Sequence, residues 1–259
     1  EDKYCVEPGT YCGLVFLFSS ENGKPLAMIN DGTIQHMRVG GGAGIGVRHL
    51  SRANSKTVGL LGSGGMARTY LRAFCVVRDI ERVKVFSPTR SNCENFATEM
   101  GVELGIQIDP VDSPREAVAD VDILASATDS MQPTFEADWL EPGMHVTNLG
   151  PAEISQDVLA RADVKIRQGT SGIEMPESDR IKSGIGHSPM AYIAGTEEEM
   201  KRLPPRSEDG SGFRLDYHNY CDIITDPSKG RTSDDQVTYY HNIGFQGLQF
   251  ASVGGAVYR

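Results

Sequence analysis

The chain has 259 residues, of which 39% are hydrophobic and 23% charged, and its formal net charge at pH 7 is −10. This length can bury a sizeable core, while the acidic balance and the lack of an apolar run near the roughly 20 residues of a membrane span exclude nucleic acid and membranes as main partners. Five cysteines without a C-x-x-C pair indicate a reduced, cytoplasmic protein without a metal site.

The chain opens on an expected antiparallel hairpin. Apolar segments at 13–18 and 25–29 flank Asn22-Gly23, the strongest short hairpin signal. The following segment, 31–50, is ambiguous, because its apolar positions lie near helical spacing but five glycines crowd its middle, each unfavourable in a helix by about 1 kcal/mol relative to alanine. Alone it predicts a loop. The alternative is a buried helix whose small face admits another backbone.

Residues 57–67 predict a short buried strand, a glycine turn and the start of a helix. The turn matches the dinucleotide fingerprint G-x-G-x-x-A, formed here by Gly62, Ser63, Gly64, Gly65, Met66 and Ala67. Gly62 would allow the tight turn, Gly64 would let the backbone approach a pyrophosphate, and Ala67 would let the helix pack closely on the strand. The free N–H groups at the helix N-terminus suit phosphate.

Strands and helices then alternate over some 110 residues. Capping boxes at Ser91–Glu94 and Ser113–Glu116 mark two helix starts, and a polar excursion is expected from about 197. The alternation predicts an α/β fold, a Rossmann-type doubly wound parallel sheet with helices on both faces. Further strands are expected at 82–86, 105–108, 123–127, 145–149 and 164–167.

Four segments in this order resemble the ornithine cyclodeaminase/mu-crystallin family. They are Asn22-Gly23-Lys24-Pro25-Leu26-Ala27 with the later Met37-Arg38, then Gly62 to Arg68, then Trp139-Leu140-Glu141-Pro142-Gly143-Met144-His145-Val146, and finally Phe250-Ala251-Ser252-Val253-Gly254. The resemblance covers most of the chain. It implies that segment 31–50 is a helix. It also implies a further substrate-binding segment before the hairpin and another helix after the last segment, so we expect this chain to begin and end inside the fold.

The resemblance also implies two domains and a homodimer. The Rossmann domain, expected at 51–229 with its polar excursion near 197–229, would be inserted in a discontinuous α+β substrate and dimerisation domain made of 1–50 and 230–259. Family members dimerise through the substrate domain.

The end of the second Rossmann strand predicts NADP as the cofactor, with NAD as the alternative. NAD sites usually carry an acidic residue there, whereas this chain has Ser87, Thr89 and Arg90, which suit a 2′-phosphate. The nicotinamide side is expected at Ala127, Thr128 and Asn148, because they lie at carboxyl ends of parallel strands. By resemblance, Ser252, Val253 and Gly254 close over the nicotinamide.

Arg38 is the expected substrate-binding residue. The family places a carboxylate-binding arginine here, and a guanidinium suits a bidentate carboxylate. The threonine that usually follows is Val39 in this chain.

Cyclodeaminases of the family carry a catalytic aspartate just after the glycine that corresponds to Gly150. This chain lacks it. Glu153 is the remaining candidate acid or base, although by resemblance it corresponds to a later glutamate of that segment, which is more often structural. His36, His145 and His187 are expected to be satisfied or solvated. The shortened loop favours an NAD(P)-dependent imine reductase or amino-acid dehydrogenase, acting on a small imino or amino acid. The alternatives are ornithine cyclodeaminase with recycled NAD, and a crystallin-like nucleotide-binding protein without turnover.

Overall fold

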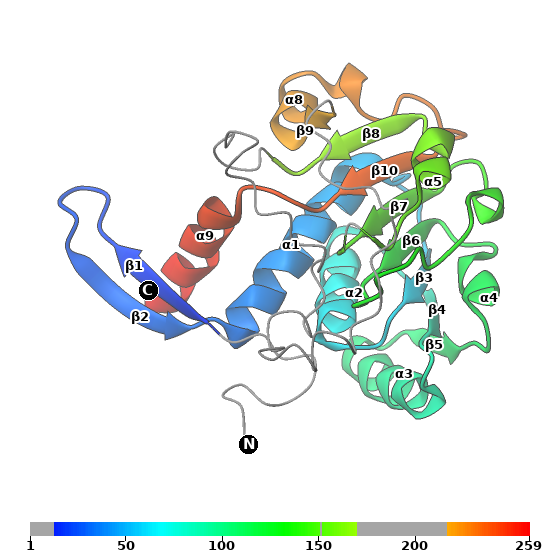
Figure 1. The fold of residues 1–259 in the computed structure, drawn as a ribbon, viewed down its shortest axis with the longest axis horizontal. Coiled ribbons are helices and arrows are strands. Elements are labelled where there is room, and N and C mark those ends of the chain that lie inside the picture. Colours follow the sequence, from blue (N-terminus) through cyan, green and yellow to red (C-terminus); the bar gives the residue numbers. More distant parts are fainter. Residues whose placement is uncertain (1–12, 151, 170–216) are drawn as a thin grey trace, which may run out of the picture.

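The computed structural model describes residues 13–150, 152–169 and 217–259, with a large sheet on one side and a two-stranded hairpin standing away from it (Figure 1). Strands β1 (Leu14–Phe18) and β2 (Pro25–Asn30) pair antiparallel, and Gly23 in the turn between them has φ +71°. The hairpin prediction is confirmed. His187 and residues 197–216 of the polar excursion lie outside the described residues, whereas 217–229 form short elements.

Within the described residues, the large sheet has eight parallel strands in the order β5-β4-β3-β6-β7-β10-β8-β9. The order reverses between β3 and β6, so the predicted doubly wound sheet is confirmed. The strands are β3 (Thr57–Leu61), β4 (Arg82–Phe86), β5 (Gln107–Pro110), β6 (Ile123–Ser126), β7 (His145–Asn148), β8 (Val164–Arg167), β9 (His218–Asn219) and β10 (Thr238–His241).

Strand β10 was not among the predicted strands, yet it lies inside the sheet between β7 and β8. The expected domain boundary at 230 assigned these residues to the substrate domain, so the sheet extends beyond that boundary. All four residues of β10 are buried, which removes the alternation that marks a half-exposed strand.

Helices cover both faces of the sheet (Figure 1). The Ser113 cap is confirmed, because its hydroxyl accepts from the Glu116 N–H (3.2 Å). The predicted capping box at Ser91 is wrong, because α3 begins at Arg90 and its N-cap is Thr89, which makes no side-chain cap hydrogen bond. No helix in the described ranges has the length and apolarity needed to cross a bilayer. The helices are α2 (Gly65–Val77), α3 (Arg90–Leu104), α4 (Pro114–Val118), α5 (Gln156–Arg161), α8 (Tyr220–Thr225) and α9 (Gln246–Tyr258), with 3-10 turns η1 (Ala137–Trp139) and η3 (Pro227–Lys229).

Helix α1 (Gly32–Leu50) shows that the ambiguous glycine-rich segment is helical. Its glycines form two i, i+4 pairs on different faces. A Cβ on Gly40 would lie 2.6 Å from the Thr69 carbonyl oxygen of α2, and one on Gly44 would lie 3.0 Å from the Ala73 Cβ. A Cβ on Gly42 would lie 2.5 Å from Asn242 Oδ1, and one on Gly46 would overlap the Tyr240 ring of β10. The glycines therefore let α1 approach α2 and the sheet at once.

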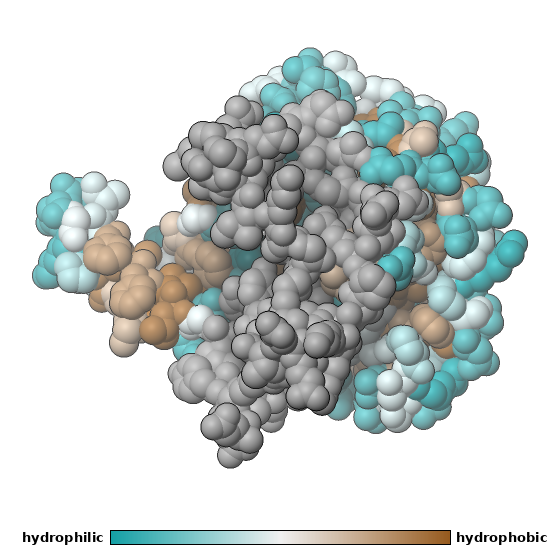
Figure 2. Space-filling model, in the orientation of Figure 1, coloured by the Kyte–Doolittle hydropathy of each residue, from teal (hydrophilic) through white to brown (hydrophobic). Residues whose placement is uncertain are grey.

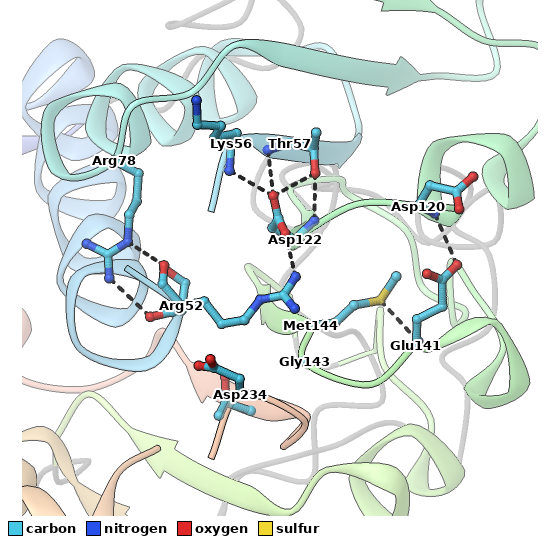
Figure 3. Close-up of polar contacts among 12 residues, drawn as sticks. Arg52, Lys56, Thr57, Arg78, Asp120, Asp122, Glu141, Gly143, Met144 and Asp234 are labelled. Atoms are coloured by element: carbon cyan, nitrogen blue, oxygen red, sulfur yellow. Dashed lines mark hydrogen bonds and ion pairs between the residues drawn. The ribbon is translucent and has the colours of Figure 1, made fainter. Parts of the chain in front are cut away.

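A polar network closes the amino edge of the sheet (Figure 3). The Asp122 carboxylate accepts hydrogen bonds from the backbone N–H groups of Lys56 (2.7 Å) and Thr57 (2.9 Å), from the Thr57 hydroxyl (2.8 Å) and from Arg52 (2.5 Å). Nearby, the Arg78 guanidinium donates to carbonyl oxygens at the C-terminal end of α1 and of Arg52. These contacts fix the end of α1 and the entry to β3.

We expect Asp122→Asn to lower the free energy of unfolding by about 1–3 kcal/mol near neutral pH, since an amide that keeps its oxygen on the two backbone donors would turn its NH₂ toward the Arg52 guanidinium. Burial alone would raise the pKa of Asp122, but the donors from Lys56, Thr57 and Arg52 hold it below its ordinary value. A lowered folded-state pKa stabilises the fold above the unfolded-state pKa, and that contribution is lost as pH falls through the folded-state value.

Urea denaturation measures the free energy of unfolding of the wild type and of Asp122→Asn. The difference between the two should be smaller at about pH 3 than near neutral pH. Asp112→Asn is the matched control, because Asp112 is exposed and pairs only at the surface with Arg90; its effect should stay within about 0.5 kcal/mol. An equal loss for the two variants at neutral pH would contradict the role assigned to Asp122.

Candidate dinucleotide site

A pocket of about 670 Å³ lies at the carboxyl edge of the sheet, where the strand order reverses between β3 and β6. This is where open parallel sheets bind ligands. The glycine turn, the end of β4 and the loop after β6 form its walls. It is lined by Leu61, Gly62, Ser63, Gly64, Gly65, Met66, Phe86, Ser87, Pro88, Asn92, Pro114, Ala127, Thr128, Asp129, Ser130, Pro133, Thr134 and Leu149.

The glycine turn has the geometry that a pyrophosphate requires. Gly62 has φ +103°, and a Cβ there would lie 3.0 Å from the Ala127 carbonyl carbon, so only glycine fits. A Cβ on Gly64 would meet no protein atom within 4 Å, which leaves open space above the turn. The N-terminus of α2 has no side-chain cap, and Ala67 is fully buried against the sheet. The exposed backbone donors suit phosphate oxygens.

The end of β4 forms the pocket wall at which the sequence predicts the adenosine half of the cofactor. Phe86, Ser87, Pro88 and Asn92 line it, and no carboxylate is among these four. The predicted contacts Thr89 and Arg90 do not line the pocket. Thr89 is the N-cap of α3, and the Arg90 guanidinium bonds Glu94 (2.9 Å) and Asp112 (2.6 Å).

The ends of β6 and β7 form the wall at which the sequence predicts the nicotinamide half of the cofactor. Ala127 and Thr128 line the pocket there, and Asp129 is the charged residue among the described lining residues. Asn148 does not line it. Its fully buried amide accepts from the Tyr239 hydroxyl (2.8 Å) and donates to the Gly150 carbonyl (2.6 Å), so Asn148 supports the neighbouring Leu149, which does line the pocket.

The prediction for Ser252, Val253 and Gly254 is wrong. These residues lie within α9, where Gly254 packs near Val15 and Ile29 of the hairpin, and none of them lines the dinucleotide pocket. Helix α9 contains several small residues, so a short Ser-Val-Gly pattern can occur in it by chance.

The segment at the corresponding place in the sheet is Asn242-Ile243-Gly244, directly after β10. Asn242 donates to the Val39 carbonyl (3.0 Å) and the Tyr70 hydroxyl (2.8 Å), which ties the sheet to α1 and α2. The sequence did contain a signal: β7 is followed by Asn148-Leu149-Gly150, the same Asn-aliphatic-Gly pattern.

Arg38 lies on α1 on the side that faces α9. Its Nε and Nη2 donate to Gln35 Oε1 (3.0 and 2.8 Å), its Nη1 donates to Gln249 Oε1 (3.0 Å), and its guanidinium stacks over the Phe250 ring at 4.9 Å. Gln35, Gln249 and the Phe250 ring thus orient the half-buried Arg38 guanidinium between α1 and α9.

Glu153 is fully buried and does not line the pocket. Burial raises the pKa of its carboxyl, and hydrogen bonds from Thr128, Gly150 and Ser126 act in the opposite direction. This placement corrects the expectation of a catalytic acid or base, because a group that exchanges protons with a bound substrate must reach it.

Two of the candidate histidines, His145 and His36, lie within the described residues and make contacts inside the fold. His145 is fully buried on β7, where burial lowers its pKa to about 3, and its Nδ1 pairs with the Thr238 hydroxyl (2.9 Å). His36 packs against the first turn of α2, so close that a Cβ on Gly65 would lie 2.6 Å from its ring. Among the described residues, no group of three or more His, Cys, Asp or Glu side chains could hold a metal ion.

Comparisons with known proteins agree with this geometry. A model of the ornithine cyclodeaminase/mu-crystallin family matches residues 7–254. The Delta(1)-pyrroline-2-carboxylate reductase of Bacillus cereus (strain ATCC 10987 / NRS 248) is 26% identical over 239 residues, 91% of this chain and 67% of that protein. A Rhizobium meliloti (strain 1021) protein is 28% identical over 228 residues, 87% of this chain and 63% of its own length. The chain therefore spans about two thirds of these relatives.

A solved structure shows the same fold. The Thermococcus litoralis Delta(1)-pyrroline-2-carboxylate reductase, in complex with NADH and L-proline, superposes with a TM-score of 0.75 at 26% sequence identity. The match covers 95% of this chain and 71% of that one.

Proposed function

Because the chain belongs to the ornithine cyclodeaminase/mu-crystallin family, we propose that it forms the core of an NAD(P)-dependent oxidoreductase that transfers hydride to or from the α-carbon of a small imino or amino acid. The observation that carries this proposal is the glycine-turn pocket at the switch point of the sheet, open above Gly64. Relatives that include pyrroline-2-carboxylate reductases support the substrate class.

Each part of the site has a proposed task. The glycine turn and the first turn of α2 would hold the pyrophosphate, and Thr128 and Leu149 would support the nicotinamide side. Arg38, oriented by Gln35 and Gln249, would hold the substrate carboxylate. A bound reduced nicotinamide supplies the hydride. The chain's own residues place the electrophilic carbon and exclude water.

NADP remains our proposal over NAD. The described residues that line the end of β4 carry hydroxyl, amide and apolar groups and no carboxylate that would accept from a ribose 2′-hydroxyl. Arg90 lies next to this wall, and a 2′-phosphate would compete with Glu94 and Asp112 for its guanidinium. Titration of NADH and NADPH against the protein, followed by nicotinamide fluorescence, compares the two affinities directly.

The proposed reaction is separable from its two alternatives by assay. A reductase consumes added reduced cofactor with a cyclic imino acid, whereas a cyclodeaminase releases ammonia from ornithine without net change in the cofactor. A binding protein without turnover does neither while still binding the dinucleotide. The buried Glu153, and the absence of the family's aspartate after Gly150, favour the reductase.

We also propose a homodimer formed through the hairpin. Figure 2 shows apolar surface over the hairpin and α9, and the outer face of the hairpin presents Leu14, Phe16, Phe18 and Met28, all more than half exposed. Such a patch marks an interaction site, and a second copy of the chain would pair the same surface with itself.

The three described cysteines are free thiols, which agrees with a reducing compartment such as the cytoplasm.

We expect Phe16→Glu to convert the dimer to a monomer, because the charge would enter the centre of the apolar face. Light scattering after size exclusion measures the mass. The matched control is Val102→Glu on α3, which is 83% exposed and distant from the hairpin, and it should leave the dimer intact. A monomeric wild type would contradict the proposed interface.

A further inference from the structure

The buried carboxylate of Glu153 joins the ends of two neighbouring strands. Its Oε1 accepts from Ser126 Oγ (2.8 Å), the Thr128 N–H (2.7 Å) and Thr128 Oγ1 (2.7 Å), at the end of β6. Its Oε2 accepts from the N–H groups of Leu149 (2.8 Å) and Gly150 (2.5 Å), at the end of β7. One side chain thus satisfies five donors from two strand ends.

The loop after β6 is attached to the same residue. The Thr134 N–H donates to the Glu153 carbonyl oxygen (3.0 Å), and its hydroxyl also approaches the Ser126 hydroxyl (2.9 Å). Glu153 therefore contacts both ends of the loop 128–134, which forms one wall of the dinucleotide pocket.

Only a carboxylate can satisfy this set of donors. Hydroxyl groups can rotate to accept, but the three backbone N–H groups from Thr128, Leu149 and Gly150 can only donate. The Thr128 N–H donates to Oε1, and the other two donate to Oε2. An amide in this place would therefore turn its NH₂ toward at least one backbone N–H. A glutamine of the same shape would leave buried donors unpaired, at a loss in free energy.

The residues that Glu153 holds are pocket residues, although Glu153 itself is not. Thr128, Thr134 and Leu149 line the pocket on its nicotinamide side, whereas Ser126 and Glu153 are fully buried behind it. We propose that Glu153 is a positioning residue of the dinucleotide site, whose carboxylate sets the spacing of the β6 and β7 ends that receive the nicotinamide half of the cofactor. This inference rests on the proposed function.

The test is the dissociation constant of NADH and NADPH, measured by nicotinamide fluorescence well below the melting temperature. Glu153→Gln should weaken binding of the preferred cofactor by about tenfold or more, because at least one strand end must shift. Ser126→Ala removes one donor without touching the pocket and should weaken it by about threefold. The matched control is Glu141→Gln. It alters an exposed carboxylate at the amino edge of the sheet that accepts a hydrogen bond from the Asp120 N–H (Figure 3). This variant should leave the dissociation constant unchanged.

The outcomes separate this inference from the proposed function. Wild-type protein that binds neither dinucleotide would overturn both. Wild-type binding that Glu153→Gln leaves within twofold would overturn the positioning role alone. A lowered melting temperature with an unchanged dissociation constant would show that Glu153 only stabilises the fold, which also contradicts the inference. If Glu153→Gln does not fold, Ser126→Ala decides, and an unchanged affinity there overturns the inference.

Discussion

Arg38→Ala should raise the KM for the imino or amino acid by roughly 10- to 100-fold while the affinity for the dinucleotide stays unchanged. A hydrogen bond to a charged group contributes about 1.5–3 kcal/mol, and the net loss of about one such interaction with the substrate carboxylate corresponds to roughly a 10- to 100-fold rise in KM. In the structure the Arg38 guanidinium is hydrogen-bonded to Gln35 and Gln249 and lies over the Phe250 ring. Its orientation is therefore fixed before a ligand binds. Steady-state kinetics with saturating cofactor separates the two constants.

Arg48→Ala is the matched control for that substitution. It removes an exposed arginine from the same helix, ten residues further along and away from α9. It should leave KM and kcat within about twofold, as for a solvated surface charge. A KM for Arg38→Ala within threefold of wild type would mean that the substrate carboxylate binds elsewhere.

Gly46→Ala should lower the free energy of unfolding by about 2–3 kcal/mol, because its Cβ would overlap the fully buried Tyr240 ring. The ring cannot move away easily, since β10 is hydrogen-bonded to β7 and β8 on both sides. The loss exceeds the gain of about 1 kcal/mol that alanine brings to a helix. Chemical denaturation measures the difference.

Gly41→Ala makes the same change on the same helix and should act in the opposite direction. A Cβ on Gly41 meets no atom within 4 Å beyond its own helix, and the residue is exposed. Helix propensity alone then predicts unchanged or higher stability, by up to about 1 kcal/mol. Equal destabilisation by the two variants would contradict the close approach of α1 to the sheet.

The dinucleotide turn was predictable because its function depends on local geometry. Gly62 needs a positive φ and Gly64 needs open space, and both needs appear directly as glycine in a short pattern between a strand and a helix. The glycine-rich helix was harder to predict. Intrinsic propensity opposes it, and only the tertiary contacts of Gly40, Gly44 and Gly46 explain why these residues are helical.

The errors came from segments whose signal depends on distant partners. Strand β10 has no alternation because both of its faces are buried, so its place between β7 and β8 is visible only in the folded sheet. Because the sequence does not mark β10, it also does not indicate that Asn242-Ile243-Gly244 follows a strand of the sheet. The role of Glu153 was likewise invisible, because its five donors come from residues 126–150 and meet only when β6 and β7 pair.

The proposed hydride transfer can be followed by the transfer of deuterium to a cyclic α-imino acid from NADH or NADPH that carries deuterium at both C4 positions. We expect one deuterium at the α-carbon of the amino-acid product, detected by mass spectrometry and NMR, since hydride would pass from the nicotinamide to that carbon. A product without deuterium, or ammonia release from ornithine in place of cofactor oxidation, would contradict the proposed hydride transfer.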